Sequence, residues 1–210
     1  MKKEVYKCIN AKRGNASLII VSKYRSEAAL MEYYDAGHRD FAENRVQELM
    51  GKAEHLPKDI KWHMIGHLQS NKVKYIAPFI HMIHSIHSLS LMDEVEKQAK
   101  KNNRVIPVCI QFNLAKEESK SGFSYEEWKD VMLYAQQKEH IKVIGIMVMG
   151  PNVEDEAKID KIFKQACQLK EENRRIYPEV FELSMGMSHD YELAVRNGST
   201  MIRVGSILFE

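Results

Sequence analysis

The chain has 210 residues, with 31 Lys and Arg against 29 Asp and Glu, for a net charge of +2. Its 44% hydrophobic and 29% charged residues are ordinary for a folded globular protein and exclude a disordered or collagenous chain. So small a net charge argues against a protein that mainly coats nucleic acid or membrane. No apolar run approaches the roughly 18 residues that span a bilayer, and residues 1–14 lack the apolar centre of a secretory signal. We therefore expect a cytoplasmic protein without nucleic-acid or membrane partners.

Short apolar runs recur along the chain between longer amphipathic stretches. Several of them are apolar at nearly every position, as in parallel strands that are buried on both faces. Their spacing averages about 26 residues, close to one strand and one helix each. Eight such units close a (β/α)8 barrel. The runs begin at Ser17, Asp40, Trp62, His81, Val105, Val143, Val180 and Met201.

The segments between these runs carry helix signals. Ser124 and Glu127, for example, form a capping box ahead of a predicted helix over residues 125–140. An open doubly wound sheet is the competing architecture, but its usual GxGxxG after the first strand is absent. No change in composition marks a domain boundary. We predict a single barrel domain over residues 1–210, in which residues 1–16 are a short N-terminal extension.

Lys23 follows the first predicted strand, and the site of a parallel barrel lies at the carboxyl ends of its strands. At the rim of an apolar interior, desolvation would favour the neutral and nucleophilic form of its amine. A lysine at the end of a strand is more often simply solvated. The functional interpretation is a lysine that forms a Schiff base with a carbonyl group.

Small and hydroxyl residues gather in the last two strand-end turns. Ser184 and Ser188 follow the seventh run, and Gly205 and Ser206 follow the eighth. Such residues, with the amides of a helix N-terminus, suit a phosphate dianion, although Ser188 could merely cap a helix and the glycines could serve turns. Together with Lys23 they indicate pyridoxal 5'-phosphate (PLP), and a phosphosugar aldolase would share both features.

Arg203 is the one charge in the otherwise apolar eighth run. Burial of a guanidinium is costly unless it meets an acceptor, and the pyridine nitrogen of PLP is such an acceptor. An arginine there would keep that nitrogen unprotonated, so the cofactor would stabilise carbanions poorly. A structural ion pair with Glu43 or Glu182 is the alternative.

The histidines do not predict a metal site. His81, His84 and His87 recur every third residue, which in a strand places the middle one on the opposite face. His63 and His67 fall on a predicted strand and its exit loop, without a nearby acid that would complete a zincin pattern. We therefore expect no metal.

Six motifs, in order over almost the whole chain, together resemble the YggS-like pyridoxal-phosphate homeostasis proteins. This resemblance implies the barrel of the alanine racemase amino-terminal domain. It also implies a protein that carries or buffers PLP, affecting vitamin B6 and amino-acid balance, with no established catalytic turnover. The motifs are VSK at 21–23, AENRVQE at 42–48, WHMIGHLQSNK at 62–72, KSG at 120–122, LSMGMSHD at 183–190 and RVGSILF at 203–209.

The resemblance also assigns roles to single residues. It implies that Lys23 forms the internal aldimine with PLP and that Arg203 faces the pyridine nitrogen. The other matched positions would hold the phosphate or line the pocket. These are Ser184, Ser188, Gly205 and Ser206 for the phosphate, and Asn44 and His67 for the lining.

The chain departs from the family pattern at residues that border the expected pocket, namely Tyr24, Arg25, Ala42, Arg45 and His87. These differences bear on loop geometry and partner contacts more than on the attachment lysine. The stretch before the first strand is also short, so we expect a curtailed amino-terminal helix that exposes the bottom of the barrel.

A weak PLP-dependent amino-acid racemase is the alternative function. Racemisation needs two bases on opposite faces of the cofactor, and two-domain racemases take one from a second domain or a partner subunit. Nothing in this sequence supplies that domain, although Tyr24 or a neighbouring chain could substitute. We predict a monomeric, non-enzymatic protein whose partners are PLP and the PLP-dependent apoenzymes that would receive it.

Overall fold

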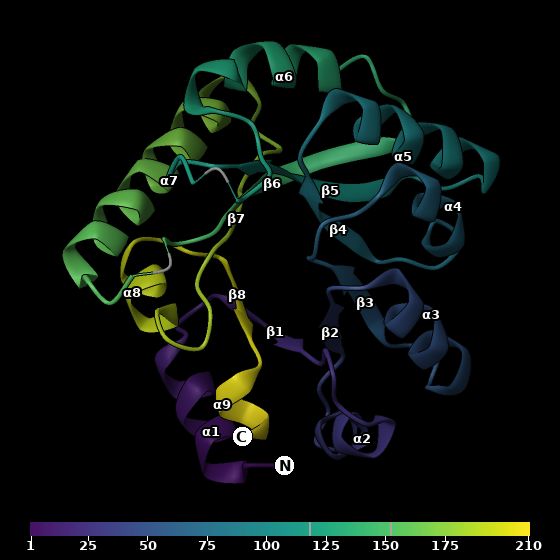
Figure 1. Ribbon diagram of the computed structural model, residues 1–210, viewed down its shortest axis with the longest axis vertical. Coiled ribbons are helices and arrows are strands. Elements are labelled where there is room, and N and C mark those ends of the chain that lie inside the picture. Colours follow the sequence, from purple (N-terminus) through teal and green to yellow (C-terminus); the bar gives the residue numbers. More distant parts are fainter. Residues whose placement is uncertain (118, 152) are drawn as a thin grey trace.

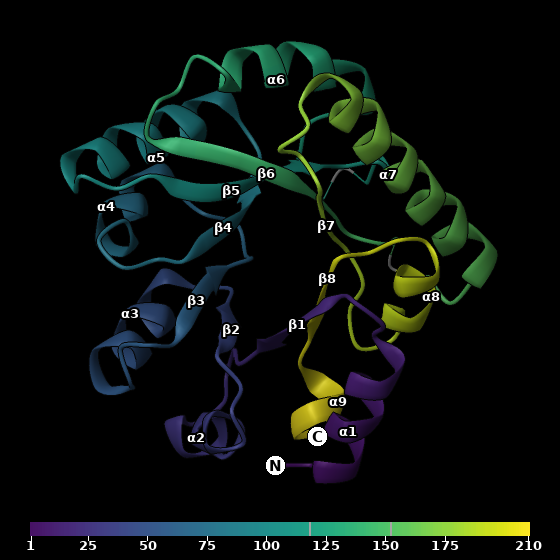
Figure 2. The same cartoon turned by 180° about the vertical axis from the view of Figure 1, so that it is seen from behind.

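The computed structural model describes residues 1–117, 119–151 and 153–210. Its parallel strands pair in chain order, and β8 returns to pair with β1, so that they form one closed barrel. Helices surround the barrel on its outer side (Figures 1 and 2). The predicted single-domain (β/α)8 barrel is confirmed.

Each of the predicted runs overlaps one strand, although β3 and β6 begin one and two residues before their runs. The strands are β1 Ser17–Val21, β2 Asp40–Glu43, β3 Lys61–Met64, β4 Met82–Ile86, β5 Ile106–Phe112, β6 Ile141–Val148, β7 Glu182–Ser184 and β8 Met201–Val204. The α-helices are α1 Lys3–Lys12, α2 Glu27–Asp35, α3 Val46–His55, α4 Val73–Ile76, α5 Leu89–Lys101, α6 Trp128–Ala135, α7 Glu156–Ile176, α8 Tyr191–Arg196 and α9 Ser206–Phe209. Short 3-10 turns precede α4 and α6 at Ser70–Lys72 and Tyr125–Glu127.

Two apolar layers explain why the strands read as apolar at nearly every position. Successive side chains of a strand point to opposite faces, so one set packs against the helices and the other fills the barrel. Ile20 and Ile202 belong to the outer layer, whereas Ile19 and Met201 belong to the inner one. The polar residues of the inner layer therefore need hydrogen-bond partners within the barrel, because apolar neighbours cannot replace the water that burial removes.

Local signals set the helix boundaries. The capping box predicted at Ser124 is present, since its backbone N–H donates to Glu127 Oε2 at 2.7 Å. Ser88 caps α5 by accepting a hydrogen bond from the backbone N–H of Leu91 at 3.2 Å. These caps satisfy backbone donors that the first turn of a helix leaves free.

The N-terminal extension forms helix α1, which lies beside α9 near both termini (Figures 1 and 2). The Tyr6 ring packs edge-on against Tyr33 at 5.5 Å between centroids, and Lys12 forms an ion pair with Glu192 at 2.8 Å. Residues 1–16 therefore carry a packed helix of ten residues. In the described part of the chain, every helix is too short or too polar to cross a membrane.

Candidate cofactor-binding site

The turn that carries Lys23 begins directly after β1. Its four residues close with a hydrogen bond from the Arg25 N–H to the Ser22 carbonyl at 3.1 Å. Tyr24 adopts a left-handed conformation with φ of 61°, and its N–H donates to Glu48 Oε2 at 3.0 Å. Lys23 itself is exposed. The expectation that the barrel interior desolvates its amine is therefore wrong, because the turn carries Lys23 past the apolar rim.

A buried ion pair lies beneath this turn. Lys52 Nζ, from α3, donates to Glu43 Oε1 at 2.6 Å and to the Ser22 carbonyl at 2.7 Å. The Ser22 hydroxyl donates to the same Glu43 oxygen at 2.7 Å. Burial raises the pKa of Glu43, although the hydrogen bonds from Lys52 and Ser22 act in the opposite direction. The pair holds Ser22 in place, and with it the turn that presents Lys23.

Arg203 projects into the barrel and is 3% exposed. Its Nη1 donates to Ser184 Oγ at 2.7 Å, and its Nη2 donates to the Val148 carbonyl at 3.2 Å. Burial lowers the pKa of Arg203 to about 10, although the charge of Asp190 opposes this shift. The guanidinium is therefore a buried cation with neutral oxygens as its hydrogen-bond partners, and it is suited to meet a further acceptor.

The alternative of an ion pair between Arg203 and a strand-end glutamate is wrong. Glu43 pairs with Lys52. Glu182 accepts a hydrogen bond from the Thr200 hydroxyl instead. Among the ion pairs of the described residues, none involves Arg203. Sequence reasoning missed Lys52, because a lysine within a helix gives no sign that it faces the barrel.

Ser184 lies deeper in the barrel than the other residues predicted to hold phosphate. It is fully buried, and besides Arg203 its hydroxyl contacts His84 Nδ1 at 2.8 Å. His84 Nε2 lies 2.9 Å from His63 Nδ1, and His63 Nε2 lies 3.2 Å from Asp40 Oδ1. These contacts form a continuous polar chain through the barrel interior. Ser184 thus supports Arg203 from inside the barrel.

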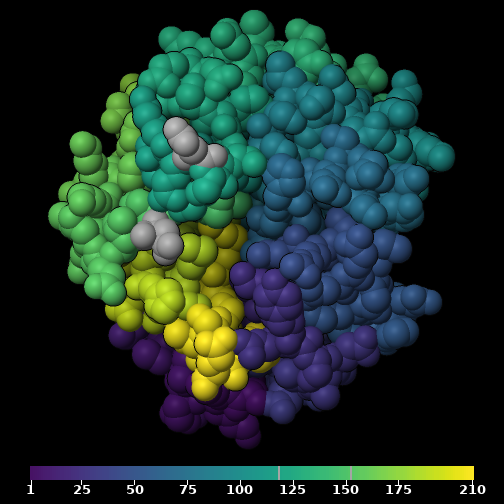
Figure 3. Space-filling view, viewed as in Figure 1, coloured from purple at the N-terminus to yellow at the C-terminus, as the bar shows by residue number. Residues whose placement is uncertain are grey.

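Ser188, Gly205 and Ser206 are half-buried at the carboxyl ends of β7 and β8. The Gly205 N–H donates to Ser188 Oγ at 3.3 Å, so the two turns are joined. The alternative role of Ser188 as a helix cap is wrong, because α8 begins at Tyr191 with Asp190 at its N-cap position. A Cβ on Gly205 would lie 2.9 Å from the Val21 carbonyl oxygen, so only glycine allows this close approach to β1. In Figure 3, the yellow C-terminal residues accordingly lie against the purple residues that follow β1.

Asn44 and His67 lie in adjacent loops after β2 and β3. A Cβ on Gly66 would lie 2.2 Å from the Asn44 carbonyl oxygen, which shows how closely the two loops pack. His67 Nδ1 lies 3.1 Å from Ser121 Oγ, and its ring stacks on His87 at 4.3 Å between centroids. His87 therefore contributes to the packing of this loop pair.

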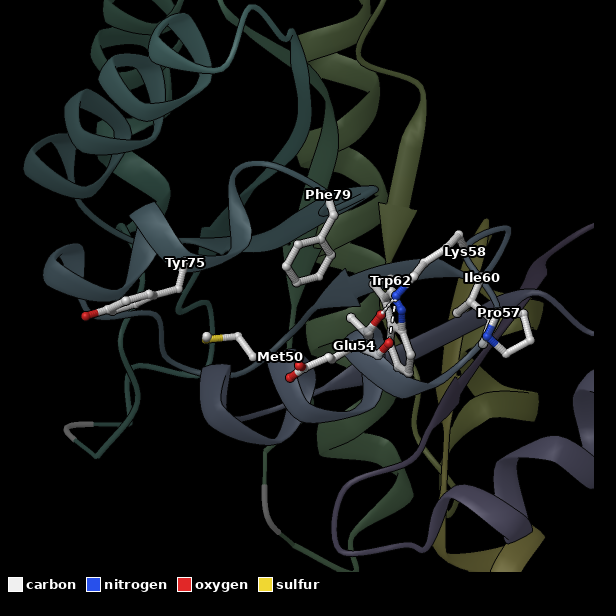
Figure 4. A pocket seen from close by; sticks show the side chains of 9 residues that line it. Met50, Glu54, Pro57, Lys58, Ile60, Trp62, Tyr75 and Phe79 are labelled. Carbon is white, nitrogen blue, oxygen red and sulfur yellow. Dashed lines mark hydrogen bonds between the residues drawn. The ribbon is translucent and has the colours of Figure 1, made fainter.

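Two of the hollows among the described residues lie outside the barrel interior. One, on the outer surface, has a volume of about 430 Å³ and is lined by residues that include Met50, Tyr75 and Phe79. Figure 4 shows these side chains. Lys58, which also lines this hollow, donates a hydrogen bond from Nζ to the Glu54 carbonyl at 2.8 Å. This mostly apolar hollow lacks every residue expected to bind PLP. The other, of about 980 Å³, includes Asp190 in its lining and adjoins the turn after β7.

Comparison with known proteins places the chain in a family. Residues 5–210 match the family described as alanine racemase, N-terminal domain. The pyridoxal phosphate homeostasis protein of Aquifex aeolicus strain VF5 is 39% identical over 206 residues, covering 96% of this chain and 90% of that protein. The chain belongs to the pyridoxal phosphate homeostasis protein family. The resemblance noted in the sequence is confirmed.

Solved structures of this family share the fold over nearly the whole chain. PipY of Synechococcus elongatus PCC7942 is 34% identical, and 99% of each chain is covered. The TM-score is 0.94 for its structure without PLP and 0.90 for its structure with PLP bound. The relative from Aquifex aeolicus carries the name of a homeostasis protein and not of an enzyme.

Proposed function

We propose that this protein binds PLP at the carboxyl ends of its strands and serves PLP homeostasis without turning over a substrate. The observation that carries the proposal is the buried guanidinium of Arg203, whose hydrogen-bond partners are neutral oxygens. A cation in this setting suits the lone pair of a ring nitrogen. The PLP-bound structure of PipY and the name of the relative from Aquifex aeolicus support the same conclusion.

The residues at the mouth of the barrel fit the remaining parts of PLP. When bound, PLP supplies an aldehyde that reacts with amines, and the exposed amine of Lys23 is accessible to it. Ser188, Gly205 and Ser206 would hold the phosphate with hydroxyl and backbone N–H groups. Ser184, which was expected to join them, would orient Arg203 instead, because its hydroxyl accepts from Arg203 Nη1. Asn44 and His67 would line the pocket beside them.

Arg203 also limits the chemistry at this site. A guanidinium donates hydrogen bonds and keeps its proton, so it would leave the ring nitrogen unprotonated and the electron sink weak. Racemisation would further require a second base. The sequence candidate for that base, Tyr24, is 69% exposed, and the Arg45 guanidinium lies 5.5 Å from its ring centroid. These features favour a binding protein over a racemase.

The proposal extends to partners and location. We propose that the monomer passes PLP to PLP-dependent apoenzymes in the cytoplasm. The exposure of Lys23 supports direct transfer, because the amine of a recipient enzyme can approach an attachment point that faces solvent.

Visible absorption of the protein titrated with PLP tests the attachment, followed by borohydride reduction and peptide mapping. We expect the label on Lys23 and loss of the protein-bound band in Lys23→Ala. Lys116→Ala is the matched control, because Lys116 is another exposed lysine in a loop after a strand and its substitution should leave the band intact. A band that persists in Lys23→Ala, or a label on another lysine, would contradict the proposal.

A further inference from the structure

Three potential metal ligands meet at the end of the barrel opposite Lys23. Asp40 is the first residue of β2, His63 lies in β3, and His81 directly precedes β4. These strands are neighbours in the barrel (Figure 1). One ligand atom from each side chain lies within 4.8 Å of the other two. We propose that Asp40, His63 and His81 bind one divalent cation of the zinc class.

The donor set and its spacing suit such a cation. Two imidazoles and one carboxylate are typical protein ligands of zinc, and three of them leave a fourth position open to water. Ligand atoms about 2.0–2.1 Å from a tetrahedral metal lie about 3.3 Å from one another. His63 Nε2 and Asp40 Oδ1 are 3.2 Å apart, close to that separation. His81 is exposed, so its ring can turn about the side-chain bonds to complete the site.

His63 is held in the orientation that a ligand requires. It is 2% exposed, and its other ring nitrogen, Nδ1, lies 2.9 Å from His84 Nε2. With the cation on Nε2, the His63 proton resides on Nδ1 and is donated to His84, which in turn donates from Nδ1 to Ser184. Metal-bound histidines commonly have such an outer partner. In the structure, His63 Nε2 faces Asp40 Oδ1 at 3.2 Å.

Positively charged side chains near the donors limit how tightly a cation can bind. Lys61 and Arg104 place positive charge near His81, so we expect weaker binding than at a site without neighbouring cations.

Titration of the PLP-loaded full chain, after EDTA treatment and dialysis, tests this site. Calorimetry with Zn²⁺ should show one equivalent bound, and Co²⁺ should give the visible absorption of a four-coordinate site. His81→Ala removes an exposed ligand without disturbing the core, and we expect at least tenfold weaker binding. Asp40→Asn should also weaken the binding of Zn²⁺.

His55→Ala is the matched control. His55 Nδ1 lies 3.0 Å from Glu27 Oε1, so this exposed pair resembles part of the proposed site but lies elsewhere on the surface. Its loss should leave the affinity unchanged. The proposal is overturned if the wild type binds no equivalent, or if His81→Ala binds as tightly as the wild type; Asp40 and His63 would then be a hydrogen-bonded pair only. None of the three proposed ligands belongs to the proposed PLP site at the other end of the barrel, so failure of one proposal is distinguishable from failure of the other.

Discussion

The ion pair beneath the Lys23 turn allows a quantitative test through Lys52→Met. This change removes the Lys52 amine, which contacts Glu43 at 2.6 Å and the Ser22 carbonyl at 2.7 Å, and keeps most of the side-chain volume. The Lys52 and Glu43 side chains are 9% and 0% exposed, so solvent screening is slight. Loss of one partner from a buried pair costs about 3–5 kcal/mol. At about 2–4 °C per kcal/mol for a domain of this size, the melting temperature should fall by roughly 6–20 °C.

The loss should depend on pH. Burial raises the folded-state pKa of Glu43 above 4.5, and removal of Lys52 raises it further because its hydrogen bond lowers that pKa. Between the unfolded and folded pKa values the folded state holds more protons, so its stability decreases as pH rises. Lys52→Met should therefore cost less at about pH 5 than at about pH 8.

Urea unfolding at both pH values measures these differences. The double variant Glu43→Gln, Lys52→Met is the control, because it removes the buried charge together with its partner. The double variant should be more stable than Lys52→Met and less stable than the wild type by about 1 kcal/mol, because the hydrogen bond from Lys52 to the Ser22 carbonyl is still missing. The reasoning would be refuted if Lys52→Met lowered the free energy of unfolding by less than about 1 kcal/mol at high pH, or by more at low pH than at high pH.

Three further outcomes follow from the site. Gly205→Ala places a Cβ 2.9 Å from the Val21 carbonyl oxygen, and we expect about 1–3 kcal/mol of destabilisation with at least tenfold weaker PLP binding. Denaturant unfolding and absorption titration check both effects, and wild-type values would count against the close approach. Ser184→Ala leaves Arg203 Nη1 and His84 Nδ1 without their shared partner, and should cost about 1–3 kcal/mol in the same unfolding assay. Single L-amino acids incubated with the PLP-loaded protein should keep their optical activity, and saturable loss of rotation would show that the protein is a racemase.

The two serines of the β7 turn region differ in what they do. Ser184 is fully buried beside Arg203, whereas Ser188 is half-buried and joined to Gly205. They are four residues apart in one motif, and their residue type gives no sign of this difference. It arises because Ser184 ends the strand with its side chain directed inward, while Ser188 follows in the loop.

Local patterns in the sequence determined the strands, the capping box at Ser124 and the barrel architecture. Backbone conformation and apolar burial produce a periodic pattern of residue types over a few neighbouring positions. This pattern can be recognised without knowing the fold. The place of Lys23, two residues after the end of β1, follows from the same pattern, since the strand itself fixes which residues come next at its carboxyl end.

Only the tertiary structure decided the exposure of Lys23, the hydrogen-bond partners of Arg203 and the meeting of Asp40, His63 and His81. The sequence pattern likewise did not predict the ion pair of Glu43 with Lys52 on α3. Each of these contacts joins separate elements, and its energy depends on distance and burial, which emerge only when the barrel closes.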